Sequence, residues 1–366
     1  MHYKVIGLMS GSSLDGLDLA YVHFEENAGK WQYTLVHTAC IAYPVEWKEK
    51  LSGLSALTAR DYLLEHSAYG HFLGKAVFDF IEEKNLSYQV QLIVSHGHTA
   101  FHMPERRMTA QLGDGAAIAA VTGIRTISDL RNVDIALGGQ GAPIVPIGEK
   151  LLFPEYDLFL NIGGIANLSA NPSAYGGDFV GFDVCPANRI LNMLAAGTQK
   201  GYDDKGSIAQ SGKTDEKLLE QLNQFPYYQQ PFPKSLSNDF GIREVYPLLS
   251  HADLSLADRL STYCAHMVFQ ISRSLLELKK LMTDKPRLRL LITGGGAHNL
   301  YLVNQIRQAV ESENIECMVG DDQLTDFKEA LIMAFIGVLR WREDINVMGS
   351  VTGASQDSIN GAVWSV

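Results

Sequence analysis

The 366-residue sequence contains three short glycine-bearing stretches, each of which follows or ends an apolar run with the pattern of a buried strand. They are Gly11-Ser12-Ser13-Leu14-Asp15-Gly16, Leu160-Asn161-Ile162-Gly163-Gly164-Ile165-Ala166-Asn167 and Leu291-Ile292-Thr293-Gly294-Gly295-Gly296-Ala297. Glycines placed directly after a strand let the backbone turn tightly and approach a ligand, and their N–H groups can surround phosphate oxygens. None of the three fits the single-loop P-loop pattern or the dinucleotide-binding pattern. The sequence therefore predicts a phosphate site assembled from separate hairpins.

The composition indicates an enzyme of about two domains, because 366 residues exceed the ~250–300 at which single cores stop growing. The 30 basic and 41 acidic residues give a net charge of −11, which disfavours nucleic acid or an anionic membrane as a partner. The four cysteines form no CxxC pair, which favours a reducing compartment. No apolar run reaches the ~18 residues of a membrane span and no signal segment opens the chain, so we expect a cytoplasmic protein.

The first half of the chain has the pattern of strands and helices in the order β-β-β-α-β-α-β. The expected elements are strands at 5–9, 17–24 and 33–42, a helical region at 47–85, a strand at 92–94, a helix at 115–121 and a strand at 125–130. The first two strands form a hairpin around the first glycine loop. Gly138-Gly139-Gln140-Gly141-Ala142-Pro143 then predicts a hinge between two halves.

The second half repeats the same order of elements, which predicts a structural duplication. Its expected elements are strands at 158–162, 166–170, 179–183 and 288–293, and helices at 187–197, 215–224, 257–282, 299–312 and 328–343. The tail from Gly349 to Val366 is expected to pack back on the first domain. The predicted division is an N-terminal lobe of residues 1–137 with about 345–366, and a C-terminal lobe of residues 138–344.

Several motifs together make the chain resemble the 1,6-anhydro-N-acetylmuramic acid kinases, a branch of the sugar kinase/actin/heat-shock chaperone superfamily. The motifs are residues 7–18, Ser95-His96-Gly97, His102-Met103-Pro104, Gln111-Leu112-Gly113-Asp114, residues 134–143, residues 161–167, Phe182-Asp183 with Pro186 and Asn188, Tyr202-Asp203 with Gly206, Ala209 and Gly212, and Glu329-Ala330. The resemblance implies an α/β fold, a two-lobed actin-like ATPase (ribonuclease H-like) duplication with an interdomain cleft. It also implies ATP and Mg²⁺ as cofactors, a sugar as substrate, and a homodimer.

The chain departs from the resembled family at four places. Ser12 stands where threonine is usual, and the usual His-Gly-Gln-Thr reads His96-Gly97-His98-Thr99. The usual Thr-Gly-Pro-Gly-Asn reads Val184-Cys185-Pro186-Ala187-Asn188, and Lys-Ser-Thr-Gly-Arg-Glu reads Lys234-Ser235-Leu236-Ser237-Asn238-Asp239. Most of these changes fall where the resemblance would put the sugar, so the substrate is less firmly indicated than the fold and the use of ATP.

Phosphoryl transfer requires positioning, charge neutralisation and a group that orients the acceptor. The backbone N–H groups of the first two glycine turns suit the β- and γ-phosphates, and the third turn lets the nucleotide lie against backbone. The predicted ATP site is Gly11, Ser12, Ser13, Leu14, Asp15, Gly16, Leu17, Asp18, Gly163, Gly164, Asn167, Gly294, Gly295 and Gly296. Asp15 and Asp18 are candidates to hold Mg²⁺ through water, although turn and cap chemistry explains such aspartates equally well.

Asp183 ends an expected strand, and the resemblance implies that it is the general base. In the resembled reaction it activates a water that attacks the anomeric carbon of a 1,6-anhydro sugar, while the departing O6 takes the γ-phosphate. The product would be N-acetylmuramic acid 6-phosphate, in cell-wall recycling. In an ordinary sugar kinase the same aspartate would deprotonate a hydroxyl. An alternative role is that of a helix N-cap before Pro186.

Four further residues are candidates for the sugar site through the resemblance: Arg131, Glu329, His96 and Gly97. A guanidinium at Arg131 suits a lactyl carboxylate or transition-state charge, and a surface salt bridge is the alternative. Glu329 opens an expected helix, where a glutamate also compensates the helix dipole.

Two hypotheses of other classes remain open. His96 and His98, with His102, could present imidazoles to a metal in a metal-dependent hydrolase, although no carboxylate-rich cluster accompanies them. The fold could also serve as a non-enzymatic ATP-binding switch, as in actin and chaperone relatives. The loop from Phe225 to Pro231 carries two tyrosines that either stack on a sugar or pack on a neighbour.

Overall fold

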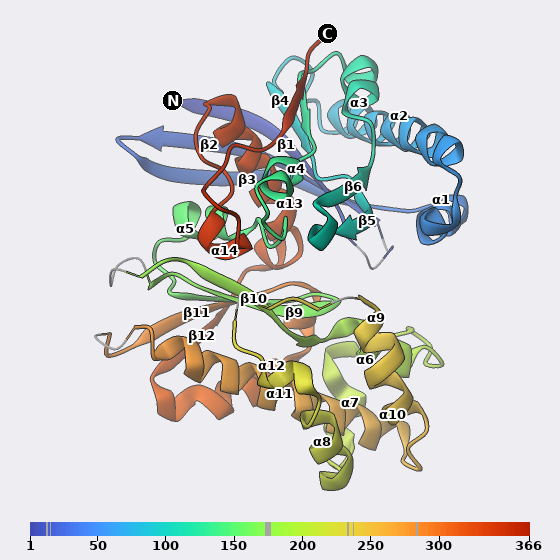
Figure 1. Ribbon diagram of the computed structural model, residues 1–366, viewed down its shortest axis with the longest axis vertical. Helices are drawn as coiled ribbons and strands as arrows, with labels where there is room; N and C mark the ends of the chain where they lie inside the picture. The colour runs from blue at the N-terminus through green and yellow to red at the C-terminus, as the bar shows by residue number, and fades with distance from the viewer. Residues whose placement is uncertain (12–13, 15, 173–176, 233, 237, 283–284) are drawn as a thin grey trace. The chain divides into compact units, whose positions relative to one another are not determined.

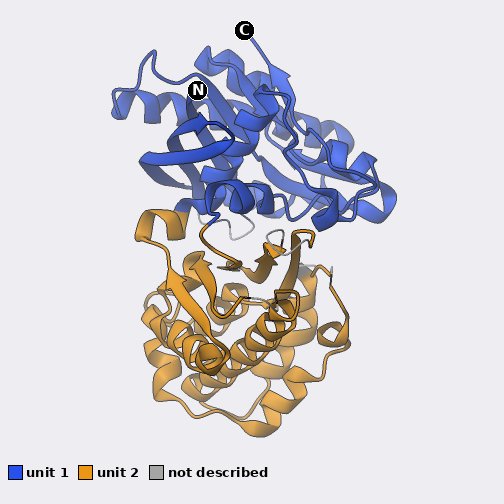
Figure 2. Cartoon of the chain, turned by 90° about the vertical axis from the view of Figure 1, so that its left-hand side faces the viewer, with its two compact units in different colours: residues 1–154, 327–366 blue, residues 155–326 orange. Residues whose placement is uncertain are grey.

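The chain forms two compact units, which Figure 2 shows in different colours. Unit 1 comprises Met1–Pro154 and Phe327–Val366, and unit 2 comprises Glu155–Asp326. The computed structural model in Figure 1 describes all residues except 12–13, 15, 173–176, 233, 237 and 283–284. In the described part of the chain, no helix is both long and apolar enough to cross a membrane.

Unit 1 is built on a six-stranded sheet with the order β13-β7-β4-β1-β2-β3. Its strands are β1 (His2–Ser10), β2 (Gly16–Asn27), β3 (Lys30–Ala42), β4 (Leu92–Ser95), β7 (Thr126–Ser128) and β13 (Ala362–Trp364). The first three form an antiparallel meander, β4 and β7 continue parallel to β1, and β13 pairs antiparallel with β7. The C-terminal tail therefore packs on the first unit, as the sequence predicts.

Unit 2 repeats this arrangement in a five-stranded sheet with the order β10-β9-β8-β11-β12. Its strands are β8 (Leu158–Ile162), β9 (Ile165–Ala170), β10 (Val180–Pro186), β11 (Leu288–Thr293) and β12 (Ile315–Val319). Here too an antiparallel meander is followed by two parallel strands. The predicted duplication and the α/β class are confirmed, because three antiparallel strands and two parallel strands recur in the same spatial order.

Helices cover both faces of the sheet of unit 1. On one face, α2 (Ala59–Glu83) and α3 (Gly115–Thr122) bury their apolar side chains against Ile6, Leu8 and Leu19 of the meander. On the other face lies α13 (Asp322–Trp341), whose Phe335 contacts the ring of Phe24. Shorter helices of this unit are α1 (Val45–Ser52), α4 (Asn132–Ala136), α5 (Pro146–Leu152) and α14 (Gly349–Thr352).

The sheet of unit 2 is apolar on the face that carries Leu158, Leu160 and Ile162 of β8. Against it pack α11 (Leu256–Lys279), α12 (Leu300–Val310) and α6 (Asn188–Ala195), whose buried leucines and isoleucines complete the core. The remaining helices are α7 (Ser207–Ser211), α8 (Glu216–Asn223), α9 (Asn238–Phe240) and α10 (Tyr246–Ser250). The alternation of the strands leaves the polar residues of β8 to β10 on the opposite face.

The boundaries of the units differ from the predicted 1–137, 138–344 and 345–366, because α5 and most of α13 belong to unit 1. Close packing explains the assignment of α13. A methyl group on Gly7 would run into the backbone of Ala330, and one on Gly337 into the side chain of Val94. These glycines let the helix lie directly on β1 and β4, which periodicity in the sequence of the helix does not reveal.

The helical region predicted at 47–85 is interrupted, since α1 ends at Ser52 and α2 begins after the cap residue Thr58. The sequence also misses the β-hairpin of β5 (His98–Met103) and β6 (Met108–Leu112) and the strand β12. Both missed regions mix polar with apolar side chains, which blurs the two-residue period of a strand.

Candidate functional site

The predicted site residues of unit 1 lie where three neighbouring parallel strands end. β1 runs into the first glycine loop at Gly11, β4 is followed by His96, and β7 is followed closely by Arg131. Carboxyl ends of adjacent parallel strands meet at one edge of a sheet, which is where open α/β sheets bind ligands. The backbone N–H of His96 donates to Leu8 O at 3.1 Å, which keeps the ends of β4 and β1 together.

Arg131 and His96 are in direct contact. Arg131 Nε donates to His96 Nε2 at 2.9 Å, and His96 Nδ1 contacts Gly97 O at 2.9 Å. A carbonyl can only accept, so the proton of the ring is on Nδ1 and Nε2 accepts from the guanidinium. Burial, helped by the neighbouring Arg131, lowers the pKa of His96 to about 3, so the imidazole is neutral. This pair orients the arginine through a single nitrogen and leaves its terminal amino groups directed elsewhere.

Glu329 on α13 is the predicted site residue whose carboxylate acts on the charge of Arg131. Burial lowers the pKa of Arg131 to about 10, while the Glu329 carboxylate raises it, so the guanidinium stays charged. The assignment of α13 to unit 1 thus brings Glu329 to Arg131, whereas the predicted division puts them in different lobes.

The helix that follows Arg131 is capped by a residue far away in the sequence. Asn360 Oδ1 accepts hydrogen bonds from Val133 N at 2.9 Å and Asp134 N at 3.1 Å, at the start of α4. A helix normally obtains these acceptors from its own N-cap residue, often Asp, Asn or Ser. Because Asn360 supplies them, the N-cap position can be occupied by Arg131, whose side chain reaches His96 instead.

The first glycine loop is described only at Gly11, Leu14 and Gly16, and the predicted ATP-binding residues Ser12, Ser13 and Asp15 lie outside the described residues. Leu14 has a φ of 58°, a left-handed conformation that is rare for a bulky residue and occurs at ligand-binding turns. Gly16 has no room for a side chain, because a methyl group would meet Cys40 Sγ at 2.6 Å.

Leu17 and Asp18 follow this loop on β2, and their side chains alternate across the sheet. Leu17 is buried in the core, and Asp18, which is half-buried, pairs with Met9 on one side and Cys40 on the other. Among the described residues there is no group of three or more His, Cys, Asp and Glu side chains that could hold a metal ion.

In unit 2, the second glycine turn connects β8 and β9 and faces the start of α6. Gly164 O accepts from Ala187 N at 2.8 Å, and Gly163 O accepts from Asn188 N at 3.0 Å. Since the carbonyl groups of the two glycines bond the start of α6, we expect their N–H groups to be the ones that bind a ligand. A methyl group on Gly163 would meet no atom closer than 3.4 Å, so packing within the chain does not require glycine there.

The third glycine stretch lies beside the second. Gly294 has a φ of 84° and, like Gly296, has no room for a methyl group, which would collide with the backbone or side chain of Ile162. Gly295 differs, because a methyl group there would meet only Asn188 Nδ2 at 3.6 Å. Packing within the chain thus requires a glycine neither at Gly163 nor at Gly295, and both residues adjoin Asn188. They mark the surface where a ligand could approach the backbone.

Asp183 belongs to a row of polar residues that crosses the sheet of unit 2. In the strand register, Asp183 on β10 is opposite Asn167 on β9, Asn167 is opposite Asn161 on β8, and Asn161 is opposite Thr293 on β11. Residues directly opposite one another share a face of the sheet. The row therefore connects the candidate base, through Asn167, with the two strands that carry the second and third glycine turns. Asn161 and Thr293 are members that the sequence analysis did not single out.

The Asp183 carboxylate is held in a largely buried setting. Its Oδ2 accepts from Leu236 N at 2.8 Å, and its backbone carbonyl accepts from the hydroxyl of Tyr227 at 2.7 Å. Burial raises the pKa of Asp183 to about 6, and the hydrogen bond from Leu236 N works in the opposite direction. At neutral pH the carboxylate is ionised yet able to take up a proton. Tyr227 and Tyr228 are buried, so the tyrosines of the 225–231 loop pack within the unit.

Two of the departures from the family pattern around Asp183, at Ala187 and Leu236, fall on positions whose backbone N–H makes a contact of the site. Leu236 bonds the carboxylate through its N–H, and Ala187 and Asn188 bond the second glycine turn through theirs. A bulge interrupts the β9–β10 pairing between Asp183 and Cys185 and turns the chain toward α6. Side chains can therefore change at these positions without loss of the hydrogen bonds that fix the site.

The histidines do not form the alternative metal site. The lone pair of His96 is taken by Arg131, and His98 Nδ1 lies 3.0 Å from Ser10 Oγ. Ser10 Oγ also contacts the hydroxyls of Tyr43 at 2.7 Å and Tyr69 at 3.1 Å, and these two hydroxyls contact each other at 2.6 Å, so His98 Nδ1 belongs to a buried network of hydroxyl groups. His98 is buried and its pKa is lowered to about 4 by burial. These two side chains serve hydrogen bonding at the ends of β1 and β4.

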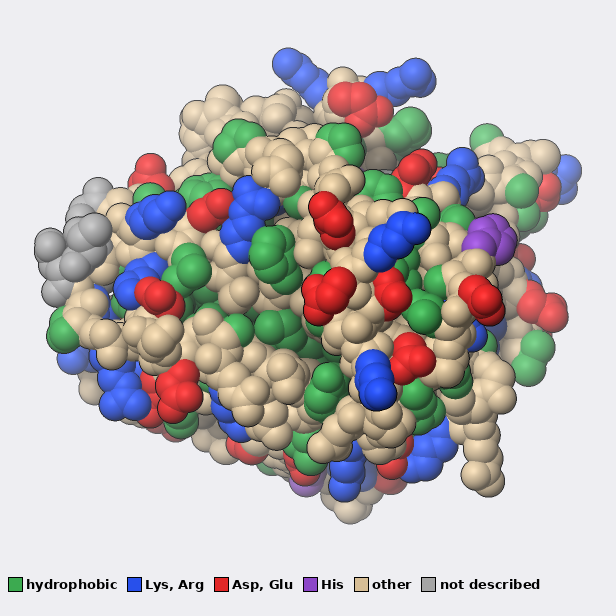
Figure 3. Space-filling model, turned by 90° about the horizontal axis from the view of Figure 1, so that it is seen from below, with side chains coloured by type: hydrophobic (Ala, Val, Ile, Leu, Met, Phe, Trp, Pro, Cys, Tyr) green, Lys and Arg blue, Asp and Glu red, His purple; other side chains and the backbone are tan. Residues whose placement is uncertain are grey.

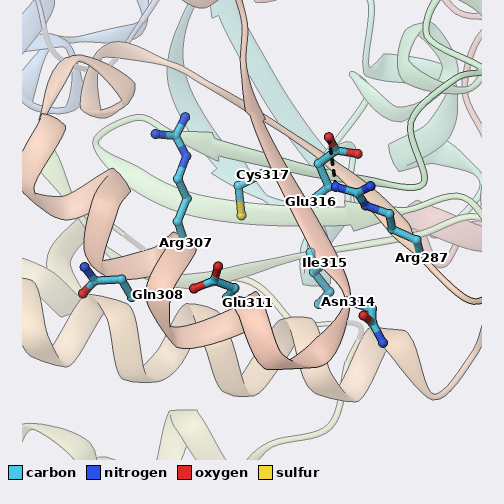
Figure 4. Close-up of a pocket in the computed structure, with 8 residues that line it drawn as sticks. All are labelled: Arg287, Arg307, Gln308, Glu311, Asn314, Ile315, Glu316 and Cys317. Atoms are coloured by element: carbon cyan, nitrogen blue, oxygen red, sulfur yellow. Dashed lines mark ion pairs between the residues drawn. The ribbon is translucent and has the colours of Figure 1, made fainter.

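A surface groove of about 420 Å³ lies at the edge strand β12 of unit 2 and holds none of the predicted site residues. Figure 4 shows its side chains, among which Arg287 forms an ion pair with Glu316 at 3.3 Å. They are Arg287, Arg307, Gln308, Glu311, Asn314, Ile315, Glu316 and Cys317. On the face of the molecule drawn in Figure 3, basic and acidic side chains are interspersed.

Comparison with known proteins gives the same family from two directions. The family described as anhydro-N-acetylmuramic acid kinase matches residues 3–366. A protein named anhydro-N-acetylmuramic acid kinase from Coxiella burnetii is 34% identical over 375 residues, covering 99% of this chain and 97% of its own length. One of the same name from Vibrio vulnificus is 32% identical over 373 residues, covering 98% of both.

A solved structure, the activator of the 2-hydroxyisocaproyl-CoA dehydratase from Clostridium difficile with bound ADPNP, has a TM-score of 0.45 and 17% identity, covering 93% of this chain and 97% of its own. The full-length match to the family and to relatives above 30% identity is decisive. The chain belongs to the anhydro-N-acetylmuramic acid kinase family and is a sugar kinase.

Proposed function

We propose that the protein is an ATP-dependent kinase that hydrolytically opens 1,6-anhydro-N-acetylmuramic acid and phosphorylates its O6. The product would be N-acetylmuramic acid 6-phosphate, released for the reuse of cell-wall sugar. The observation that carries the proposal is the setting of Asp183, a half-buried carboxylate whose pKa is raised to about 6 and which a backbone N–H holds in place. The family match supplies the class of substrate.

Asp183 is the base in this reaction. It takes a proton from a water molecule that attacks C1 of the sugar, and the C1–O6 bond breaks as the C1–O bond to water forms. O6 leaves with the electron pair of that bond and accepts the γ-phosphoryl group of ATP. The net change is sugar, water and ATP to sugar 6-phosphate, ADP and a proton. A carboxylate that is ionised at neutral pH, but whose pKa is raised towards it, suits the uptake of that proton.

The phosphates of ATP are bound mainly by backbone. The N–H groups of Gly163 and Gly164, whose carbonyls accept from the start of α6, would bind the phosphates together with Gly295. Asp18 and Asp15 would hold Mg²⁺ through water, and the bound ion would supply charge neutralisation for the transferring phosphoryl group. Because ATP is the donor, we assign the reaction to the cytoplasm.

The sugar is bound by Arg131, Glu329, His96 and Gly97. The Arg131 guanidinium, held through Nε by His96, directs its terminal amino groups to the lactyl carboxylate, which a planar fork matches with two hydrogen bonds. Glu329 keeps the guanidinium charged and is an acceptor for sugar hydroxyls.

A second candidate is a kinase that phosphorylates a free hydroxyl of another sugar, with Asp183 as the base for that hydroxyl. The same carboxylate serves both reactions, so the substrate decides between them. The test is ADP release with ATP and Mg²⁺ in the presence of 1,6-anhydro-N-acetylmuramic acid, N-acetylmuramic acid, levoglucosan or no sugar. Stimulation by the anhydromuramic sugar alone supports the proposal. Activity with another sugar only would replace it by the second candidate, and no activity with any sugar would contradict both.

A further inference from the structure

The β5–β6 hairpin of unit 1 carries a directed chain of hydrogen bonds that ends at Gln111. Gln111 Nε2 is 2.8 Å from Thr109 Oγ1, and Thr109 Oγ1 is 3.1 Å from His102 Nδ1. Thr109 Oγ1 also lies 3.4 Å from Phe101 O, to which it can donate. All four residues lie in unit 1.

The direction of this chain follows from the chemistry of each partner. The hydroxyl of Thr109 has a single proton, and two acceptors are in reach of it, His102 Nδ1 at 3.1 Å and Phe101 O at 3.4 Å. Thr109 Oγ1 has then spent its only proton and can only accept from Gln111. The amide of Gln111 is therefore fixed with Nε2 toward Thr109 and Oε1 away from it.

Gln111 Oε1 is a buried acceptor that finds no hydrogen-bond donor among the residues the structure describes. Gln111 is only 6% exposed. A buried polar atom without a partner is unfavourable and uncommon in folded proteins, and in a binding site it marks the position of a missing donor. A carbonyl oxygen in this state requires an O–H or N–H group from a ligand or a water.

The position of Gln111 connects it with the predicted sugar-binding residues. Gly97, at the end of β4, has a φ of 71°, and a methyl group on it would meet Gln111 Cβ at 3.0 Å and Leu112 O at 2.6 Å. The glycine thus lets the β6 strand lie directly against the segment that carries His96 and, through it, Arg131. His102, at the other end of this chain of hydrogen bonds, is close enough for the charge of Arg131 to act on it.

We propose that Gln111 is a specificity-determining residue of the sugar site, whose Oε1 accepts a hydrogen bond from an O–H or N–H group of the bound sugar. The inference rests on the proposed function of this site and adds to it a residue that accepts a hydrogen bond from the substrate. Its amide is oriented before the sugar arrives by Thr109 and His102, so little conformational entropy is lost on binding. Gln111 contacts the substrate in this proposal, whereas Thr109 is a positioning residue.

The test compares Gln111→Met, which keeps the length of the side chain and removes the acceptor, with the wild-type protein. We expect the KM for the anhydro sugar to rise about tenfold, the loss of one neutral hydrogen bond, with the KM for ATP unchanged. Gln89→Met is the matched control, because Gln89 is exposed and its Nε2 donates to Asn85 O. It should leave both KM values unchanged.

A variant that fails to fold would be replaced by Thr109→Val, which removes the acceptor that orients the amide. It should raise the KM for the sugar, by less than Gln111→Met, and leave the KM for ATP alone. Unchanged sugar KM in a folded Gln111→Met or Thr109→Val protein would overturn the inference and assign Oε1 to a bound water, while the wild-type activity would still support the proposed function. A wild-type protein that neither binds nor turns over any sugar would overturn both.

A third measurement distinguishes the two kinds of donor. An anhydro sugar without a substituent at C2 lacks the acetamido N–H. If the N–H is the donor, Gln111→Met should cost tenfold in KM with the acetamido sugar and nothing with the 2-deoxy sugar. If a ring hydroxyl is the donor, the cost should be the same for both. Either pattern supports the contact with the sugar and identifies the group that makes it.

Discussion

Arg131 Nε donates to His96 Nε2 at 2.9 Å, and this contact joins the segments that follow two neighbouring parallel strands. The histidine cannot turn away, because its other nitrogen donates to Gly97 O. Nor does it gain a proton near neutral pH, since burial lowers its pKa to about 3. The His96 ring thus fixes the orientation of the Arg131 guanidinium. Its Nε bonds the ring, and the two terminal nitrogens remain for a carboxylate.

Arg131→Lys should lower kcat/KM for the sugar at least about a hundredfold, because an ammonium cannot bond His96 and grip a carboxylate with a planar fork at once. The affinity for ATP, measured by calorimetry, should stay within about twofold. His96→Phe is the companion variant, since it removes the hydrogen-bond acceptor of Arg131 Nε and keeps the arginine. It should also reduce sugar turnover, and full activity of this variant would show that the histidine does not orient Arg131.

Asp183→Asn should abolish turnover and leave ATP binding nearly intact, because the amide cannot take up a proton. The same substitution should stabilise the protein. The native pKa of Asp183, about 6, lies above the ~3.9 of an unfolded aspartate, so the stability linked to its protonation is present below pH 4 and lost as the pH rises through 6.

At pH 8 the ionised carboxylate therefore lowers the free energy of unfolding by up to about 3 kcal/mol, because each pKa unit corresponds to about 1.4 kcal/mol. Thermal unfolding of the Asp183→Asn variant and the wild-type protein at pH 8 and pH 4 measures this. The variant should melt at a higher temperature at pH 8, and the difference should vanish at pH 4. A variant that is equally or less stable at pH 8 would contradict the burial of a charge at this position.

The pH dependence of kcat/KM should show one acidic limb with an apparent pKa near 6 and a plateau above it, because the ionised form of Asp183 is the active one. His96 and His98, with pKa values lowered to about 3 and 4, stay neutral over this range and add no limb. Rates of ADP release between pH 5 and 9 with saturating ATP test this. A limb near pH 7 would instead point to a histidine as the base.

The glycines of the ATP site provide a prediction with an internal control. Gly163→Ala and Gly295→Ala should fold normally, because their methyl groups would meet no atom closer than 3.4 Å and 3.6 Å. We expect them to raise the KM for ATP about tenfold or more, since the methyl group takes the space of the phosphates. Gly296→Ala collides with Ile162 and should instead lower the melting temperature. Normal ATP binding in both of the first two variants would remove these turns from the nucleotide site.

The sequence predicts the repeated strand order because most strands of both meanders contain apolar runs, and a glycine turn follows the first strand of each. The three glycine stretches are found in the same way, as turns after buried strands, whereas the role of Asp183 is what the family resemblance implies. Periodicity says nothing about which of several glycines the fold requires. That Gly294 and Gly296 are needed for packing and Gly295 is not follows only from the contacts with Ile162 and Asn188.

The rest of the site depends on contacts between residues that are far apart in the sequence. Leu236 N holds the Asp183 carboxylate, and Asn360 caps the helix after Arg131. Neither residue carries a local signal, since one acts through its backbone and the other lies near the end of the chain. Gln111 lies in a hairpin whose polar residues obscure its strands, although the family resemblance includes it. Such residues are found by identifying the hydrogen-bond partner of each buried polar atom.

Lys328 and Glu149 form an ion pair at 2.8 Å whose side chains are only 2% and 4% exposed, between α13 and α5. Lys328→Met leaves the Glu149 carboxylate buried without this cation, and we expect a loss of about 3–5 kcal/mol in the free energy of unfolding. Replacing both partners, as Glu149→Met with Lys328→Met, should recover most of that loss, because two apolar side chains need no compensation.

Glu329 follows Lys328 on α13, and the helix is also held on the sheet by the close contact of Gly7 with Ala330. The double variant should therefore keep the sugar KM of the wild-type protein. Urea unfolding and sugar kinetics of the three variants measure both effects. Equal stability of the Lys328→Met variant and the wild-type protein would mean that the ion pair does not anchor α13, and that the glycine contacts with β1 and β4 hold Glu329 beside Arg131 on their own.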